Sequence, residues 1–448
     1  MPLKYLFSAA AAAWWLLVAA PVARADTDRL RVTTRYDQEY PVLAYSGPAT
    51  QNRIARLQQR LESGELKLAW EPGFGYFRSL LKALQIEPDS QVLVFSRTSL
   101  QIEHISPQKP RAVYFNDDTY VAYVHDTPLV EIAAIDAQKG AVFYAFDNRR
   151  ETQPIRVERE GGRCLSCHDT YSMMGGGVPR VMVMSAPVED PSDTRTYTAA
   201  EEVDDRTPIA QRWGGWYVTG NTGTQTHFGN LSLREERAGE RLRELQPTRL
   251  NLASVKAYVD ATTYLTDQSD VTALMVLEHQ TWLQNLITRV NYKVRTVMAR
   301  EADAPVAGVP RSWAEVNPGD RKRMQAMIEP LVRALFFQEA VPFAQPIHGH
   351  SGFAERFSKS GPRDSQGRGL HELDLGTRLQ RYPLSFVIHS AQFDALPQYA
   401  LDYLNARIVE VLQGRDTTGI AARITAADRL AITQILIDTK PALAALLR

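Results

Sequence analysis

The spacing of apolar residues changes along the chain and separates a mixed first part from a helical second part. Asn52–Gly64 and Tyr76–Ile86 carry apolar residues at helical intervals, which predicts two helices. Four runs rich in branched and aromatic residues follow, separated by turn residues: Gln91–Ile105, Arg111–His125, Leu129–Asp136 and Ala141–Asn148. Such runs predict strands, and Asn116–Asp118 inside the second run is typical of a hairpin turn. We therefore expect an antiparallel sheet here.

From about Glu235 onward the helical period dominates. The longest periodic stretch, Asp270–Arg300, begins with an aspartate in the position of an N-terminal cap. The other stretches for which this pattern predicts helices are Leu252–Leu265, Arg311–Gln338, Pro397–Gly414 and Ala426–Thr439. The polar stretch Ser358–Gly369 predicts a surface loop.

Together these patterns predict an α+β protein with an N-terminal antiparallel β-rich part, a central loop-rich segment and a predominantly helical C-terminal half. We expect the corresponding units at residues 26–155, 156–234 and 235–448. The central segment contains one strand-like run, Pro179–Val188. Residues 1–25 belong to none of these units.

The N-terminus has the pattern of a secretory signal peptide. Lys4 precedes the apolar run Leu6–Val22, and Ala23-Arg24-Ala25 offers the small residues that signal peptidase recognises. The run is too short, and its flanks are wrong, for a stable membrane span; an uncleaved anchor is the alternative. We therefore expect an exported, periplasmic protein with no membrane span after cleavage.

The charge balance excludes several classes of partner. The 448 residues contain 51 basic and 51 acidic side chains. Removing residues 1–25 takes away Lys4 and Arg24, which leaves 49 basic side chains and a net charge of −2. This balance disfavours a nucleic-acid-binding protein, and no polybasic tail suggests an anionic membrane surface as partner.

The only two cysteines, Cys164 and Cys167, stand three positions apart and directly before His168. Covalent haem attachment needs two thiols that reach two vinyl groups of the porphyrin, and a base that reaches the iron. One helical turn between the cysteines aligns both sulfur atoms along one edge of the ring, and the next residue projects an imidazole towards the metal. The pattern predicts one haem c per chain, with His168 as the proximal ligand whose other ring nitrogen donates to a backbone carbonyl.

Three other fates of these cysteines are weaker. A thioredoxin-type redox pair would use the same spacing, but it usually lies between a strand and a helix. A zinc site needs a fourth ligand, and the chain has no second cysteine pair to supply one. A structural disulfide across so small a loop would add little stability.

The sixth iron ligand is the least defined part of the predicted site. His227 lies in a flexible glycine-rich segment and His279 lies on the apolar stripe of the long predicted helix, so these two are the leading candidates. The alternatives are a surface-loop histidine for the first and a hydrogen-bonded core histidine for the second. Four methionines rank below them: Met173, Met174, Met182 and Met184.

The segment Arg212–Asn230 combines five glycines with two tryptophans, a tyrosine and His227. Glycine allows close approach of the backbone, and aromatic side chains pack on flat surfaces. This composition suits packing against a haem face, and it suits equally a loop that caps the sheet with core tryptophans.

With these motifs in view, the sequence resembles a group of large exported bacterial proteins that carry one c-type haem, the cytochrome c domain-containing proteins. The blocks that carry the resemblance are Tyr114–Asp118, Cys164–His168, Arg212–Gly220 with His227–Asn230, Leu277–Gln280 and Arg381–Pro397. Asn221-Thr222-Gly223 departs from the pattern, since similar chains are expected to carry a histidine before the last glycine. The resemblance implies haem c, export and a shared architecture, and it implies no reaction.

The leading functional hypothesis is a periplasmic monohaem c-type cytochrome that exchanges single electrons with a protein partner. The alternative is a haem-dependent oxidoreductase, peroxidase-like or acting on a small-molecule substrate, that uses an open sixth iron position. The size of the chain favours this alternative, because one ordinary domain is enough to enclose a haem. A haem-based ligand sensor is a third possibility, for which the sequence shows no output module.

Overall fold

The computed structural model describes residues 42–47, 50–96, 98–150, 155–169, 177–187, 200–231, 249–302 and 315–448. Within them the protein has the predicted mixed α+β fold, with a six-stranded antiparallel sheet in the N-terminal part and a helical C-terminal half. The predicted signal peptide lies outside the described residues. Along the described part of the chain, no helix combines the length and the apolar composition that crossing a membrane requires.

The sheet is a simple antiparallel meander in which each strand pairs with the next one along the chain. Its strands are β1 (Val92–Val94), β2 (Arg111–Phe115), β3 (Thr119–Tyr123), β4 (Leu129–Asp136), β5 (Gly140–Asp147) and β6 (Val157–Glu160). The predicted Asn116–Asp118 hairpin joins β2 to β3, and the Asn116 side-chain oxygen accepts the backbone N–H of Thr119 at 3.0 Å. Antiparallel neighbours with short connections are what these short, turn-separated runs favour.

Alternate residues of the strands supply two cores, one on each face of the sheet. Ala133 of β4 and Phe143 of β5 belong to the first core, which continues into the helical half. Ile132 and Val142 belong to the second core, which α2 (Arg53–Glu62) and α3 (Phe77–Ala83) cover. Successive side chains of a strand point to opposite faces of the sheet. When both faces are buried, the sequence of each strand is therefore a nearly continuous apolar run.

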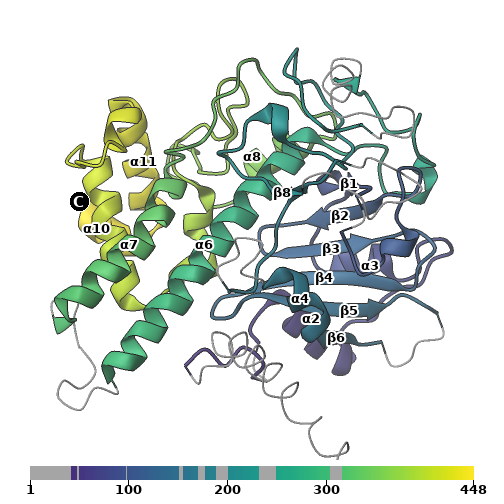
Figure 1. The fold of residues 1–448 in the computed structure, drawn as a ribbon, viewed down its shortest axis with the longest axis horizontal. Helices are drawn as coiled ribbons and strands as arrows, with labels where there is room; N and C mark the ends of the chain where they lie inside the picture. Colours follow the sequence, from purple (N-terminus) through teal and green to yellow (C-terminus); the bar gives the residue numbers. More distant parts are fainter. Residues whose placement is uncertain are drawn as a thin grey trace, which may run out of the picture.

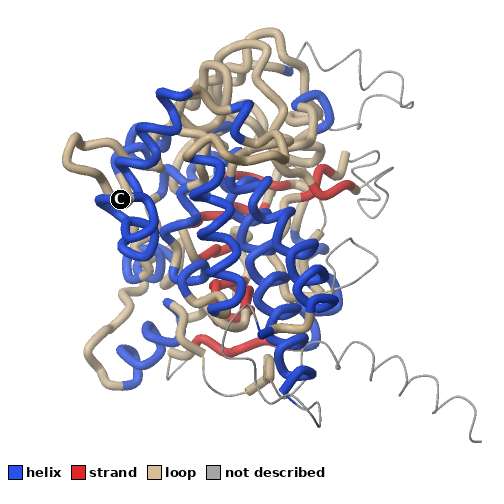
Figure 2. Tube along the Cα trace, turned by 90° about the vertical axis from the view of Figure 1, so that its left-hand side faces the viewer, coloured by secondary structure: helices blue, strands red, loops and turns tan. Residues whose placement is uncertain are grey.

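The helical half packs on the first face of the sheet. Its helices are α6 (Val271–Ala302), α7 (Pro318–Leu335), α8 (Phe353–Lys359), α9 (Ala391–Asp394), α10 (Gln398–Leu412), α11 (Ala426–Thr439) and α12 (Pro441–Leu447). Figure 1 shows α6 between the sheet and the helices α7, α10 and α11. In the view of Figure 2 the helices lie in front of the strands. The division into three separate domains stays a prediction, and the first core runs from β1 to α12.

The long helix α6 confirms the prediction for Asp270–Arg300. The Asp270 carboxylate accepts the backbone N–H groups of Thr272 at 2.8 Å and Ala273 at 3.2 Å, so it caps the helix as expected. Polar side chains in the middle of α6 are buried yet paired. Gln280 and Gln284, for example, hydrogen-bond to the Tyr120 hydroxyl at 2.9 and 2.5 Å, which ties the helix to the sheet.

Three predicted elements differ from the structure, the first being the strand-like run Pro179–Val188, whose described residues form a strand only at Met184–Ser185. Leu252–Leu265 is not an α-helix and contains only the 3₁₀ turn Ala261–Thr263, and its buried apolar residues belong to the second core. Gln91–Ile105 yields only the three-residue strand β1. Beyond it, the N–H groups of Phe95 and Ser96 both donate to the Gly215 carbonyl, at 2.7 and 3.1 Å, and the segment then turns away.

Candidate haem site

The Cys-x-x-Cys-His motif forms α4 (Gly162–His168), a short helix that follows directly after β6. Figure 1 shows α4 beside β4 and β5, and the His168 ring lies 4.7 Å from the ring of Phe143, which is on β5. Cys164 and Leu165 pack against the first core. The sheet therefore anchors one side of α4 and leaves its other side at the surface.

The two thiols are free, with Cys167 exposed and Cys164 partly buried. Burial, and then the carboxylates of Glu160 and Glu131, raise the pKa of Cys164 to about 11. A thioredoxin-type redox pair needs a thiolate as nucleophile, and its attacking cysteine has a lowered pKa. This environment keeps Cys164 protonated, which disfavours a redox-active disulfide. A protonated thiol is compatible with the formation of a thioether bond to haem.

His168 is held through one ring nitrogen. Its Nδ1 lies 2.9 Å from the carbonyl oxygen of Arg180, and the Arg180 N–H donates back to the His168 carbonyl at 3.0 Å. A carbonyl can only accept, so Nδ1 carries the proton, and the lone pair of the neutral ring lies on Nε2. This is the orientation that metal-bound histidines receive from a backbone carbonyl.

Charged side chains around α4 are arranged in pairs. Arg180 is buried and forms an ion pair with Glu202, and Arg111 lies 3.3 Å from Glu131. Burial lowers the pKa of His168, and the positive charges of Arg111 and Arg180 lower it further. Both effects keep the ring neutral, which is the form that binds a metal.

These residues fit a covalently attached haem better than they fit a bare metal ion. Among the described residues, no group of three or more His, Cys, Asp or Glu side chains is arranged to hold a metal. A zinc site at α4 would need such a group. Two free thiols and a neutral imidazole on one short helix are the residues that the haem c pattern requires.

His279 is held by two protein partners. Its Nδ1 lies 2.6 Å from an Asp205 carboxylate oxygen and its Nε2 lies 2.7 Å from the Ser385 hydroxyl. The ring is fully buried and stacks on Phe337 at 4.5 Å. With both nitrogens engaged, the geometry favours the alternative of a hydrogen-bonded core histidine over a role as sixth iron ligand.

Asp205, His279 and Ser385 form a hydrogen-bonded chain in the order carboxylate, imidazole, hydroxyl, which is the order in the catalytic triad of serine hydrolases. Ser385 is fully buried, however, and its hydroxyl also accepts the Val387 N–H at 3.2 Å, while its own N–H donates to the Leu335 carbonyl. A nucleophile needs access for a substrate. This hydrogen-bonded chain therefore connects α6 to the segments that contain Asp205 and Ser385, and its role is to stabilise the fold.

His227 is also buried, but its ring nitrogens have no hydrogen-bond partner among the described residues. The ring meets Trp213 edge-on with 5.0 Å between centroids. Burial lowers the pKa of His227 to about 4. His227 is thus a neutral imidazole inside the protein, and its ring packs on Trp213.

The segment Arg212–Asn230 caps the sheet. Trp213 and Trp216 are buried in the first core, and the Tyr217 N–H donates to the Leu93 carbonyl of β1 at 2.9 Å. Gly215 has a φ of +80°, and a Cβ there would lie 2.6 Å from the Ala186 carbonyl oxygen and from the Ser96 Cβ. The structure thus uses the glycines for close backbone packing against the edge of the sheet.

The methionine candidates remain undecided. Met173 and Met174 lie outside the described residues. Met184 belongs to the two-residue strand β7 (Met184–Ser185), whose partner is β8 (Glu201–Glu202), and the Met184 carbonyl accepts the Trp216 indole N–H at 2.7 Å. Met182 and Met184 are both partly buried, whereas Val183 between them enters the core.

The sequence did not point to the residues that orient His168. Arg180 contributes a backbone carbonyl, which any residue could supply, and Phe143 reads as an ordinary strand residue. Only the position of Arg180 in an otherwise apolar run, before Val181, could have drawn attention to a buried charge. Comparisons with protein-family models, curated proteins and solved structures find no match, so the resemblance described above rests on the sequence motifs alone.

Proposed function

We propose that this protein is a periplasmic c-type cytochrome that carries one covalently attached haem and exchanges single electrons with a protein partner. The observation that carries the proposal is the hydrogen bond from His168 Nδ1 to the Arg180 carbonyl, because it leaves Nε2 as the donor atom for iron. Cys164 and Cys167 would form the thioether bonds. A haem held in this way supplies an iron centre that takes up and releases one electron.

The surface position of α4 supports exchange with another protein. Ser166 and Cys167 are exposed, as are the glycines at the start of the helix. A group attached at Cys167 would therefore have an edge near solvent, where a partner can approach. The hydrogen bond to the Arg180 carbonyl and the packing of the ring on Phe143 hold the His168 imidazole in one orientation.

Export itself is part of the proposal, because the predicted signal peptide precedes the described residues. The spacing of the cysteines and the expected compartment agree, since haem attachment to such motifs takes place on exported chains. Absorption spectra of the purified protein, produced with its own leader in a bacterium that attaches haem c, test the proposal. A c-type spectrum that changes reversibly on reduction supports it, and a colourless protein contradicts it.

A haem-dependent oxidoreductase is the second candidate. The observation in its favour is that Asp205 and Ser385 occupy both ring nitrogens of His279, and that His227 packs on Trp213. If no protein side chain fills the sixth position, peroxide or a small substrate could react there. Carbon monoxide added to the reduced protein separates the candidates: an unchanged spectrum indicates six filled positions and electron transfer, and a rapid change indicates an open position.

A further inference from the structure

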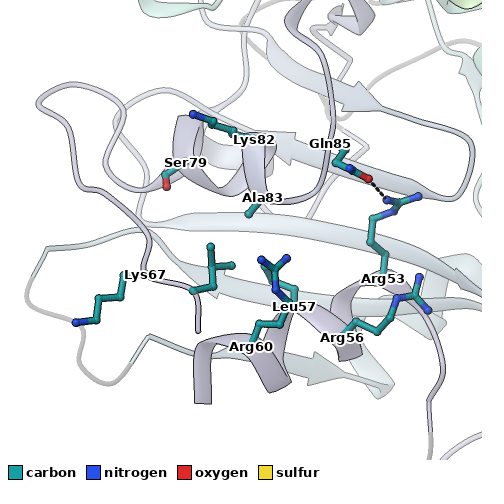
Figure 3. Close-up of a pocket in the computed structure, with 10 residues that line it drawn as sticks. Arg53, Arg56, Leu57, Arg60, Lys67, Ser79, Lys82, Ala83 and Gln85 are labelled. Carbon is teal, nitrogen blue, oxygen red and sulfur yellow. Dashed lines mark hydrogen bonds between the residues drawn. The ribbon is translucent and has the colours of Figure 1, made fainter. Parts of the chain in front are cut away.

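A basic cleft lies between α2 and α3, on the face of the sheet that carries the second core. Its volume is about 640 Å³, and five of its ten lining residues are cationic: Arg53, Arg56, Arg60, Lys67 and Lys82. No carboxylate is among the lining residues. In Figure 3, Arg60 reaches into the space between the two helices and Arg53 points to Gln85 at one end of it, whereas Arg56, Lys67 and Lys82 extend outward from its rim.

The sequence of α2 explains why its cations gather on one side. Arg53, Arg56 and Arg60 follow one another at intervals of three and four, which places them along one stripe of a helix. Ile54 and Leu57 form the neighbouring, buried stripe against the second core. The apolar side fixes α2 on the sheet and thereby directs the arginines towards α3.

Neighbouring carboxylates neutralise two of the five charges. Arg53 binds Asp118 with two hydrogen bonds of 2.9 and 3.2 Å and donates to the Gln85 side chain at 3.0 Å. Arg60 binds Glu65 at 2.7 Å. Within the described part of the chain, no carboxylate forms an ion pair with the remaining three cations. The cleft therefore has a surplus of three positive charges, contributed by Arg56, Lys67 and Lys82.

The floor of the cleft is apolar, and one hydroxyl borders it. Leu57, Leu66 and Ala83 line the space below the charged side chains. The Ser79 oxygen accepts the Ala69 N–H at 3.0 Å, so its own proton is available to a ligand. A site with cations at the rim and apolar side chains below suits a molecule that has a multiply charged group on a less polar body.

We propose that this cleft binds a ligand through phosphate groups. Arg56 offers a planar fork that matches phosphate oxygens in pairs, and Lys67 and Lys82 add mobile point charges, while Arg53 and Arg60 remain bound to Asp118 and Glu65. A surplus of three charges matches a diphosphate or two phosphate groups better than it matches a single carboxylate. The site is independent of the proposed haem function, because α2 and α3 lie on the second core whereas α4 packs mainly on the first.

Isothermal titration of the protein with inorganic pyrophosphate at low ionic strength tests the proposal. Lys67→Glu with Lys82→Glu reverses two exposed charges that no described carboxylate pairs with, and it should weaken binding about tenfold. Binding should also disappear at 1 M salt, where the screening length falls to about 3 Å. The control is Lys359→Glu, which reverses an exposed lysine on α8 and should leave the affinity unchanged.

Flotation with vesicles separates a soluble ligand from a lipid headgroup. Binding to phosphatidylglycerol vesicles but not to phosphatidylcholine vesicles, with competition by pyrophosphate, identifies a lipid headgroup. Pyrophosphate binding without vesicle binding identifies a soluble phosphate compound. Thermal unfolding of Lys67→Gln with Lys82→Gln checks that the variants fold, and this pair should show an intermediate loss of affinity. Absence of both kinds of binding, or equal loss in Lys359→Glu, would overturn the proposal.

Discussion

Helix α4 and the middle of α6 both present a histidine packed against an aromatic ring, yet their ring nitrogens have different partners. His168 gives one nitrogen to the Arg180 carbonyl, and its ring packs on Phe143. His279 gives both nitrogens to side chains, Asp205 and Ser385. The first arrangement leaves Nε2 for the iron of the proposed haem, and the second engages both ring nitrogens within the protein. Partners of ring nitrogens, rather than burial, therefore distinguish the two roles.

The two helices also differ in their exposure to solvent. In α4, Ser166 and Cys167 are exposed, so a group can be attached from outside. In α6, Glu278 lies fully buried beside His279 and accepts hydrogen bonds from Arg212 at 2.9 Å and Trp213 at 2.6 Å. Burial raises the pKa of Glu278 to about 7, and these two donors oppose that effect. Part of α4 is thus open to solvent, as the proposed haem attachment requires, whereas the buried polar groups of α6 connect segments of the fold.

Removing both thiols should produce the largest effect. Cys164→Ala with Cys167→Ala eliminates both thioether bonds, so we expect complete loss of covalently bound haem. A haem stain of the denatured protein after electrophoresis measures this. Ser166→Ala, between the two cysteines, is the matched control and should retain full staining. Equal staining of the double variant and the control would remove the basis of the comparison.

Truncating the two histidines should separate a core residue from a ligand. His279→Ala leaves Asp205 and Ser385 buried without a partner and creates a cavity, so the free energy of unfolding should fall by about 4 kcal/mol. His168→Ala removes one hydrogen bond and should cost about 1 kcal/mol in the haem-free protein. Urea unfolding measures both, with the exposed His350→Ala as a control expected within about 0.5 kcal/mol of the parent.

Absorption spectra of the same variants complete this test. The haem spectrum should change in His168→Ala and stay unchanged in His279→Ala. A spectral change in His279→Ala with little loss of stability would place His279 at the iron and reverse the roles assigned to the two helices.

The buried ring of His227 should make stability depend on pH. Its pKa of about 4 lies below the ordinary value of 6.5, so the unfolded chain binds more protons between these values. Stability from this group is complete above about pH 6.5 and is lost as the pH falls towards 4, by about 3 kcal/mol in total. Urea unfolding at several pH values should show a shallower acid loss in His227→Phe.

A second buried histidine contributes to the same acid loss. Burial, followed by the charges of Lys440 and His371, lowers the pKa of His389 to about 4. The His227→Phe variant should therefore retain part of the pH dependence, and His389→Phe should remove a further part. An identical pH profile for the parent and His227→Phe would mean that His227 is coordinated or solvated rather than neutral and buried.

The cap of α6 should have the smallest effect. Asp270→Ala removes the acceptor for the N–H groups of Thr272 and Ala273, which should cost about 2 kcal/mol. The same carboxylate accepts the Ser351 N–H at 2.8 Å, so the loss should lie at the upper end of the range for caps. Asp270→Asn keeps an acceptor and should retain most of the stability in thermal unfolding.

The sequence predicted the parts of the fold that local patterns determine. Leu129–Asp136 and Ala426–Thr439 were predicted with the bounds that the structure shows, because alternation and helical periodicity continue to their ends. Leu252–Leu265 was predicted wrongly, because spacing alone does not distinguish a helix from a chain whose Val255, Val259 and Tyr264 enter a core from successive turns.

In the candidate site, too, local features could be predicted from the sequence and long-range contacts could not. Adjacent residues specify the two thiols and His168, so their common position on α4 was predictable. The Arg180 carbonyl, Phe143 and the partners of His279 come from distant segments, and one sequence contains no signal for such pairings. The identity of a sixth ligand depends on these long-range contacts, which is why His227 and His279 could be named but not ranked.

The mass of the denatured protein tests the central claim most directly. The protein should be produced with its leader in a host that attaches haem c, unfolded in acid, and measured intact. We predict the mass of the chain after removal of its leader plus one haem, with the same addition found on the peptide that contains Cys164 and Cys167. A mass equal to the bare polypeptide, from a host that loads a known c-type cytochrome in parallel, would contradict the account.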